Sequence, residues 1–197
     1  MIAFVQGKFE EKHPTHVVVN MQGLGYEIKI SLNTYAQIKD MESAKLYTHF
    51  SVKEDSQTLY GFKEESEKQR FADLISISGV GPSTAIMILS SLSPKELQNA
   101  IVGEDVRTIQ GVKGIGTKTA QRIVLELKDK MKKEGLLEKS SEIPTKTDNR
   151  LATEALSALV TLGLPKSTAD KTINLIIREY GPEISLEELI KLALKRA

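Results

Sequence analysis

Residues 77–85 read ISGVGPSTA, and residues 112–120 read VKGIGTKTA, the same pattern thirty-five positions later. In each copy an apolar stripe with helical spacing ends, a Gly-aliphatic-Gly turn follows, and a new helix is expected to begin at once. Glycine tolerates a positive φ and keeps no side chain between the backbone and a ligand. The apolar positions before the two turns also match, since Leu74 corresponds to Ile109 and Phe71 to Val106. The sequence therefore predicts two copies of one helix–turn–helix unit.

Each turn is a candidate phosphate site. The first N–H groups of a helix have no partner inside the helix, and the helix dipole favours an anion there. A single Gly-x-Gly between helices is more often only a tight connection. Two copies in one register can place two such phosphate sites, called cradles below, at a fixed separation. That arrangement suits the repeating phosphates of a nucleic-acid strand. Contacts of this kind read no base.

Two basic residues follow the second turn. Lys118 and Arg122 lie at i and i+4, so a helix would bring them to the same face beside the cradle. They are candidates for contacts with the DNA backbone, although the same spacing also describes an ordinary solvated face. The predicted DNA-binding residues are Gly79, Val80, Gly81, Ser83, Gly114, Ile115, Gly116, Lys118, Thr119 and Arg122.

The composition is ordinary for a soluble globular chain, with 40% hydrophobic and 27% charged residues among 197. The net charge of +1 argues against a nonspecific polycation, so DNA affinity must come from placed charges. The chain has no cysteine, and His13, His16 and His49 fit no spacing typical of a metal site. The sequence shows neither a membrane-spanning apolar run nor the features of a secretory signal. We expect a cytoplasmic protein without metal or cofactor.

The expected fold class is α+β with several domains. Residues 1–62 alternate apolar and polar side chains in five short runs, and a helix over 32–38, capped by Ser31, follows the third run. This is the element order of an OB-fold β-barrel. The predicted divisions are an N-terminal barrel over 1–62, a tandem helix-hairpin-helix domain over 63–134, a flexible linker over 135–149, and a three-helix, UBA-like domain over 150–197. The charged run at 128–133 is expected to be a solvated helix end.

The chain resembles the RuvA family, whose members bind Holliday junctions in the bacterial branch-migration complex. The two Gly-aliphatic-Gly turns match the tandem helix-hairpin-helix motifs of that family. The stretch 48–62, THFSVKEDSQTLYGF, matches the family segment that carries an acidic hairpin called the pin. The matching acids here are Glu54 and Asp55, which without the resemblance would be read as two solvated loop residues.

The resemblance implies a homotetramer, or an octamer on DNA, that holds a four-way junction open with acidic pins at its centre. It implies that the third domain docks on RuvB, the hexameric motor that uses ATP and Mg²⁺, and that the RuvC resolvase is a further partner. The chain itself would be a non-catalytic subunit. The residues that correspond to the family's motor contacts are Leu159, Leu162, Leu164 and Leu194. Among them Leu164, just before Pro165, is expected to be the exposed anchor, and Leu159 is expected to be both a core residue and a contact.

The chain departs from the family pattern at both turns. Ser83 stands where relatives carry a lysine, so a charge-assisted phosphate contact is absent there. In the second motif Lys113 stands in place of a common proline, and Thr117 in place of a lysine. Lys113 can restore a positive charge near the turn.

Three other functions fit the residues less well. A P-loop NTPase would need Lys directly after the second glycine, but Thr117 separates Gly116 from Lys118, and the stretch follows a helical pattern instead of a strand. A helix-hairpin-helix glycosylase or nuclease would need a base pocket, which 5% aromatic residues and no Trp supply poorly. A pure protein-interaction scaffold would leave the twin turns without a use.

Overall fold

The computed structural model describes residues 2–141, 147–181 and 184–196, and these form two compact units, residues 1–138 and 139–197. The strands are β1 (Phe4–Lys12), β2 (His16–Met21), β3 (Leu24–Ile30), β4 (Ser43–Val52) and β5 (Gln57–Phe62). The helices are α1 (Leu32–Ile38), α2 (Glu65–Ile75), α3 (Pro82–Ser91), α4 (Pro94–Val102), α5 (Val106–Gln110), α6 (Thr117–Ser141), α7 (Thr147–Thr161), α8 (Lys166–Tyr180) and α9 (Leu186–Arg196).

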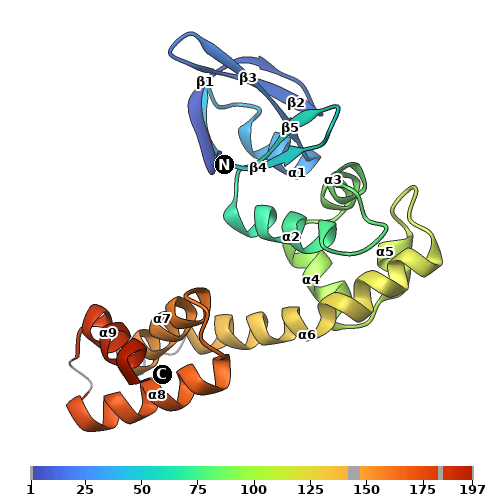
Figure 1. Cartoon of the computed structure of the whole chain (residues 1–197). Helices are drawn as coiled ribbons and strands as arrows, with labels where there is room; N and C mark the ends of the chain where they lie inside the picture. The colour runs from blue at the N-terminus through green and yellow to red at the C-terminus, as the bar shows by residue number, and fades with distance from the viewer. Residues whose placement is uncertain (1, 142–146, 182–183, 197) are drawn as a thin grey trace. The chain divides into compact units, whose positions relative to one another are not determined.

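The five strands close into a barrel in the order β1-β2-β3-β5-β4, with β3 and β5 parallel and the other pairs antiparallel (Figure 1). Alternate apolar side chains point inward, as period-two alternation requires. Helix α1 lies in sequence between β3 and β4, and the Ser31 hydroxyl accepts a hydrogen bond from the N–H of Thr34 at 3.0 Å. The predicted OB-fold barrel, its inserted helix and the cap of that helix are confirmed. The barrel core is made of Val5, Phe9, Val17, Val19, Ile28, Ile30, Ile38, Ala44, Leu46 and Leu59.

Helices α2 to α6 form the predicted tandem helix-hairpin-helix domain. The first hairpin consists of α2, the turn at 76–81 and α3, and the second consists of α5, the turn at 111–116 and α6. Helix α4 connects them, and it begins with a capping box in which Ser93 and Glu96 bond each other's backbone. The side chains of the two hairpins share one continuous apolar core.

The first hairpin is tied to the barrel through both apolar and polar contacts. The ring of Phe71 packs against those of Phe62, Tyr60 and His49, with centroid distances of 5.0, 5.1 and 5.2 Å. Beside this cluster the buried carboxylate of Glu67 accepts hydrogen bonds from the hydroxyls of Ser31 and of Thr34, the latter at 2.7 Å.

Burial raises the pKa of Glu67, and its two hydroxyl partners offset only part of that effect. The residue therefore joins the barrel to the helices through hydrogen bonds while its ionised form is disfavoured by the surroundings.

Helix α6 extends past the charged run at 128–133, so the expectation that the helix ends there is wrong, whereas four of the six residues in the run are exposed to solvent as expected. Met131 within the run is fully buried, and Lys130 pairs with Asp73 of α2. Directly after the run, Glu134 pairs with the buried Arg70 of α2. The run therefore packs α6 against α2, and the helix continues because its inner face still has a partner.

The C-terminal unit is a three-helix domain, as predicted. Helices α7, α8 and α9 surround a small apolar core, which consists of Ala155, Leu159, Ala169, Ile173, Ile176, Ile184, Leu189 and Ala193. Helices α7 and α8 are followed by Gly163 and Gly181, which have φ values of 100° and 83°. Glycine suits this left-handed position because it has no Cβ to clash. The N–H of Glu188 bonds the hydroxyl of Ser185 at 3.2 Å, which caps α9.

The predicted linker over 135–149 is largely helical where the structure describes it. Helix α6 runs to Ser141 and α7 begins at Thr147, while residues 142–146 lie outside the described residues. The boundary between the two units, at 138/139, falls inside the predicted linker. The flexibility of that linker stays a prediction. Within the described part of the chain, none of the helices combines the length and apolarity that a membrane crossing needs.

Candidate nucleic-acid interface

The two turns have the same backbone conformation. Gly79 and Gly114 adopt φ values of 89° and 86°, a region that L side chains rarely occupy. In each turn the N–H two residues before the new helix donates to the carbonyl three residues back, from Val80 to Ile77 at 3.0 Å and from Ile115 to Val112 at 3.1 Å. The N–H groups of Ala85 and Ala120 then bond the carbonyls of Gly81 and Gly116 at 2.9 and 3.0 Å. The sequence repeat is therefore also a repeat in geometry.

Two of the predicted site residues hold the turns in place. The side chains of Val80 and Ile115 are 4% and 6% exposed and lie in the shared core. Their N–H groups are already used inside the turns. Neither the side chain nor the amide of Val80 or Ile115 is available to a phosphate. These residues therefore act by positioning the glycines beside them.

The open part of each cradle is the start of the new helix. Gly81 is the N-cap of α3, with no side-chain cap, and Gly116 precedes Thr117, the first residue of α6. No heavy atom lies within 4 Å of where a Cβ would stand at either glycine, leaving out its chain neighbours. The space beside each of these glycines is therefore open. Pro82, the first residue of α3, has no N–H, so the first helical donors are the N–H groups of Ser83 in α3 and of Thr117 in α6, with Thr119 also in the first turn of α6. This is the arrangement that binds an anion at a helix N-terminus.

The side chains around the two cradles differ. Ser83 and Lys118 occupy matching positions in the repeat, and both are exposed. Burial raises the pKa of Tyr60 of the barrel, and the nearby Ser83 hydroxyl partly offsets that rise. Lys118 projects a positive charge beside the second cradle, and Lys113 is exposed in the turn before it. Positive charge is therefore concentrated at the second hairpin.

The hairpins contact each other through a second pair of matching positions, Met87 and Arg122. The Arg122 guanidinium on α6 donates to the carbonyl of Ser78, in the first turn, at 3.0 Å. In the other direction, the methyl of Met87 on α3 lies beside Gly114 in the second turn. It is 3.6 Å from where a Cβ would stand if Gly114 carried one. Arg122 also pairs with Glu126 at 3.5 Å, and its side chain is half exposed.

These contacts revise the predicted role of Arg122. Its guanidinium supports the first turn, so it is a positioning residue whose remaining N–H groups are the part that can meet DNA. Sequence reasoning missed Met87, although the thirty-five-residue offset pairs it with Arg122.

The predicted acidic pin is the tip of the β4–β5 hairpin. Val52 and Gln57 pair across the two strands, and the N–H of Lys53 donates to the carbonyl of Ser56 at 2.8 Å, which closes the turn. Glu54 and Asp55 stand at the tip, and both are exposed. The hairpin therefore presents two adjacent carboxylates to solvent.

The four predicted partner-binding leucines divide into three environments. Leu159 is fully buried in the core of the C-terminal unit, as expected. Leu162 and Leu194 are exposed, by 60% and 44%. Leu164 is only partly exposed and packs against the core, so the expectation that it is the exposed anchor is wrong. The N–H of Leu164 bonds the carbonyl of Leu159 at 3.0 Å, and this bond turns the chain back toward the core after Gly163.

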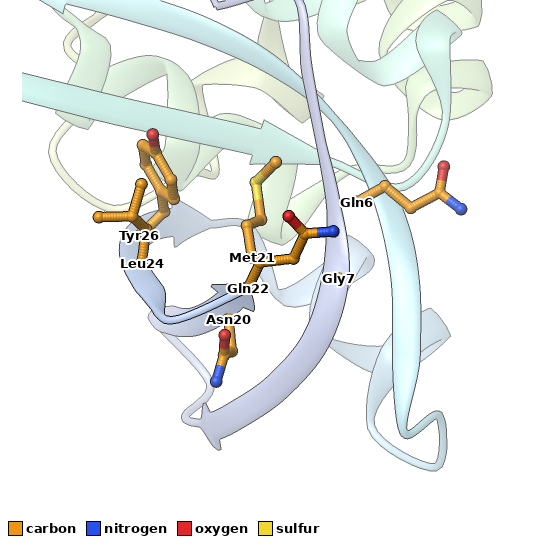
Figure 2. Close-up of a pocket in the computed structure, with 7 residues that line it drawn as sticks. All are labelled: Gln6, Gly7, Asn20, Met21, Gln22, Leu24 and Tyr26. Atoms are coloured by element: carbon orange, nitrogen blue, oxygen red, sulfur yellow. The ribbon is translucent and has the colours of Figure 1, made fainter.

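A pocket on the barrel lies between β1 and the β2–β3 turn (Figure 2). It is lined by Gln6, Gly7, Asn20, Met21, Gln22, Leu24 and Tyr26. At Gly7 the two strands approach so closely that a Cβ would stand 2.2 Å from the carbonyl oxygen of Asn20. None of the lining side chains carries a charge. The pocket therefore lacks the charged hydrogen-bond donors for a phosphate that the second hairpin has.

Comparison with known proteins matches all three regions. Residues 1–61 match the RuvA N-terminal domain, residues 71–129 a SAM-like tandem helix-hairpin-helix, and residues 150–197 the RuvA C-terminal domain. Similar proteins include the Holliday junction branch migration complex subunits RuvA of Cytophaga hutchinsonii, 52% identical, and of Amoebophilus asiaticus, 47% identical, each over 99% of this chain and 99–100% of the relative. The subunit of the same name from Christiangramia forsetii is 51% identical over the whole of both chains. With this fold, these paired turns and relatives matched from end to end, the chain belongs to the RuvA family.

Proposed function

We propose that this chain binds four-way DNA junctions and recruits an ATP-driven motor for branch migration, itself acting as a non-catalytic subunit. The observation that carries the proposal is the pair of cradles with one backbone geometry, held at a fixed separation by Arg122 and Met87. Two such cradles suit successive phosphates and leave the bases unread. The names of the relatives, Holliday junction branch migration complex subunit RuvA, support the same substrate.

The assembly follows from the shape of a four-way junction. A homotetramer would offer one copy of the paired cradles to each arm, and two tetramers could enclose the junction as an octamer. Glu54 and Asp55 from each chain would then gather near the centre. Carboxylates there repel phosphates, which would hold the strands apart without any bond chemistry.

The other partners belong to the C-terminal unit and the motor. The exposed Leu162 and Leu194 offer apolar contacts for RuvB, a hexameric ATPase, and the RuvC resolvase is a further partner of the assembly. ATP and Mg²⁺ would be used by the motor, so DNA binding by this chain needs no cofactor. The complex would act in the cytoplasm, where the DNA is.

A gel shift with a synthetic four-way junction and a linear duplex of equal length tests the DNA-binding proposal. We expect the junction to be bound much more tightly than the duplex at moderate salt. The informative variant is Gly81→Ser with Gly116→Ser. Serine is a favoured N-cap whose hydroxyl accepts hydrogen bonds from the first helical N–H groups. The free energy of unfolding should therefore be maintained, while those N–H groups are no longer free to bind DNA.

A charge-assisted hydrogen bond is worth about 1.5–3 kcal/mol, so junction affinity of this double variant should fall about tenfold or more. Unchanged affinity in a folded variant would contradict the role of the amides. Equal binding of duplex and junction by the wild type would contradict junction recognition itself. Adding Mg²⁺ and ATP to labelled junctions separates this function from a nuclease, because no cleaved strand should appear.

Motor recruitment is tested at Leu162. Leu162→Asp should weaken binding of RuvB from the same organism in a pull-down or surface-binding assay while the C-terminal unit stays folded. Leu175→Asp is the matched control, because Leu175 on α8 is 62% exposed. Equal loss in both variants would show a nonspecific effect of charge and would contradict a contact at Leu162.

A further inference from the structure

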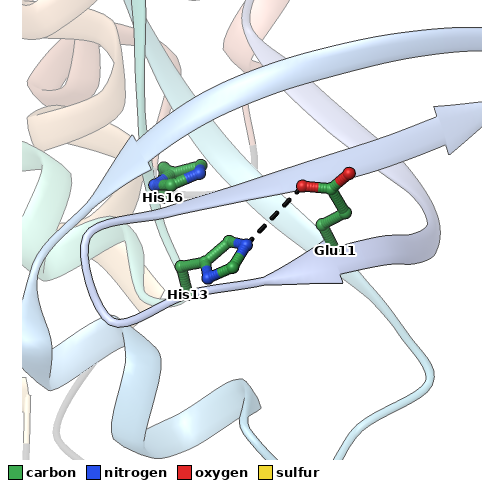
Figure 3. A group of neighbouring side chains, drawn as sticks. All are labelled: Glu11, His13 and His16. Carbon is green, nitrogen blue, oxygen red and sulfur yellow. Dashed lines mark ion pairs between the residues drawn. The ribbon is translucent and has the colours of Figure 1, made fainter.

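The structure brings together three potential metal ligands at the tip of the β1–β2 hairpin. Glu11, His13 and His16 each place one ligand atom within 4.8 Å of the others (Figure 3). The Oε2 of Glu11 lies 3.6 Å from the Nε2 of His13, and the rings of His13 and His16 stack with centroids 4.6 Å apart. The spacing of these residues along the sequence did not indicate a site, because the grouping depends on how the hairpin folds.

A β-bulge creates this grouping. The register between β1 and β2 shifts between Phe9 and Glu11, so Phe9 pairs with the buried Val19 and Glu11 pairs with the half-buried Val18. Residues directly opposite each other share a face of the sheet. Without the extra residue, Glu11 and His13 would lie on the inward face with Phe9, because strand positions two apart share a face.

The opposite face of the hairpin is anchored. Lys12 points the other way and its ammonium donates to the carbonyls of Lys39 and Met41, at 2.6 and 2.9 Å, just after α1. The turn is closed by two hydrogen bonds between the backbones of His13 and His16, at 2.8 and 3.3 Å. The N–H of Ile30 also bonds the carbonyl of Thr15 at 3.1 Å. The three ligands are therefore carried by a backbone that is held on several sides.

The distances suit a small divalent ion. Two ligands of a tetrahedral Zn²⁺ at metal distances of about 2.0–2.1 Å lie about 3.3 Å apart. The Glu11–His13 separation is close to this value, and rotation of exposed side chains can close the remainder. In the tautomer whose Nδ1–H donates to the hydroxyl of Thr15 at 3.1 Å, the Nε2 of His16 carries a lone pair. A hydrogen bond of this kind orients a ligating imidazole.

We propose that Glu11, His13 and His16 form a binding site for a divalent transition-metal ion of the Zn²⁺ class. Two imidazoles and one carboxylate are a donor set that zinc, copper and nickel accept and that Mg²⁺ and Ca²⁺ do not favour. Three protein ligands leave a further position open to water or to another molecule. The site lies on the barrel and uses none of the residues assigned to DNA, so it goes beyond junction binding.

The test is a calorimetric titration of ZnCl₂ into the full-length, chelator-treated protein, prepared without a polyhistidine tag. We expect one Zn²⁺ per chain, and affinity at least about tenfold weaker in His13→Gln and in His16→Gln. Glu11→Gln should also weaken binding. The matched controls are His49→Gln, which changes the third histidine, and Glu10→Gln, which makes the same charge change one residue away. Both should bind as the wild type does.

A measurement on the wild type alone guards against variants that fold poorly. In imidazole ¹H–¹⁵N spectra, Zn²⁺ should shift the resonances of His13 and His16 and leave those of His49 in place. Lys29 lies opposite His16 in the register, so Lys29→Gln should tighten binding by removing a nearby positive charge. Absence of one-site binding, wild-type affinity in His13→Gln and His16→Gln, or shifts confined to His49 would overturn the proposal.

Discussion

The first hairpin, built from α2 and α3, and the second, built from α5 and α6, surround nearly identical turns with different neighbours. The first turn has a serine beside it and its leading helix packs deeply on the barrel, where Phe71 is fully buried. The second has Lys113 and Lys118 beside its turn, and its leading helix has only five residues. The duplication thus preserves the main-chain cradle, while one copy has become the anchor to the barrel and the other carries the charge.

The largest expected difference between the hairpins is in stability, at the matching positions Phe71 and Val106. Phe71→Ala removes a ring that contacts three others in a fully buried site, and we expect a loss of about 3–5 kcal/mol in the free energy of unfolding. Val106 is only partly buried, so Val106→Ala should lower it by roughly 1 kcal/mol. Urea unfolding of the two variants measures this. Equal losses would mean that the first hairpin is no more an anchor than the second.

The next effect tests whether the two turns are equally strained. Gly79→Ala and Gly114→Ala each force an L side chain to a φ near 90°, which should lower stability by about 1–2 kcal/mol in both. In Gly114→Ala the new methyl also makes an ordinary van der Waals contact with Met87, so its loss should be the same or slightly smaller. Thermal unfolding compares them, with Gly81→Ser, at a φ of −85°, as the unstrained control. A clear loss in only one of the two alanine variants would break the geometric equivalence of the turns.

A smaller effect concerns charge at the matching positions Ser83 and Lys118. Lys118→Ser should weaken junction binding for unrelated sequences alike and reduce the slope of log K against log salt by about 1. Ser83→Lys should change the slope by a similar amount in the other direction, since it gives the first cradle the charge it lacks. Fluorescence anisotropy at several salt concentrations measures both slopes. A change confined to one base sequence would contradict contacts with phosphate.

The smallest effect is a dependence of stability on pH that involves α2 of the first hairpin. Because the folded-state pKa of Glu67 is raised, its contribution to stability is fully present below the unfolded pKa near 4.5 and is lost as pH rises through the folded value. The side chain in Glu67→Gln does not ionise, so the variant does not lose this stability as pH rises. The stability of the variant relative to wild type should therefore increase from pH 4 to pH 7, as read from urea unfolding at each pH.

The carboxyls with lowered pKa values, such as Glu96 and Asp105, are present in both proteins and cancel in that difference. A relative stability that stays constant with pH would mean that Glu67 is ionised as easily in the folded chain as in the unfolded one.

Local patterns predicted local structure well. The repeat at 77–85 and 112–120 predicted both turns, and Ser31 predicted the start of α1. Each of these depends on residues within a few positions of one another. The family resemblance then supplied the pin and the partner residues, which periodicity alone would have left as loop and core.

Contacts between distant segments could not be predicted in the same way. Periodicity gives the apolar face of a helix but not the element that covers it. The charged run therefore predicts a helix end, although Met131 is buried and Lys130 and Glu134 pair with residues of α2. Leu164 was placed outside the core because the turn after Gly163 reverses the chain in a way that spacing does not reveal. The bond from Arg122 to Ser78 joins residues 44 positions apart and leaves no signal in either segment.

The crossed contacts of Arg122 and Met87 have a consequence for how a strand is captured. Because each hairpin braces the turn of the other, the conformational entropy of aligning the two cradles is lost during folding, before DNA arrives. Under the proposed function, the neighbour of a bound phosphate would meet the second cradle at a high effective concentration, so two weak contacts would act as one strong binding site.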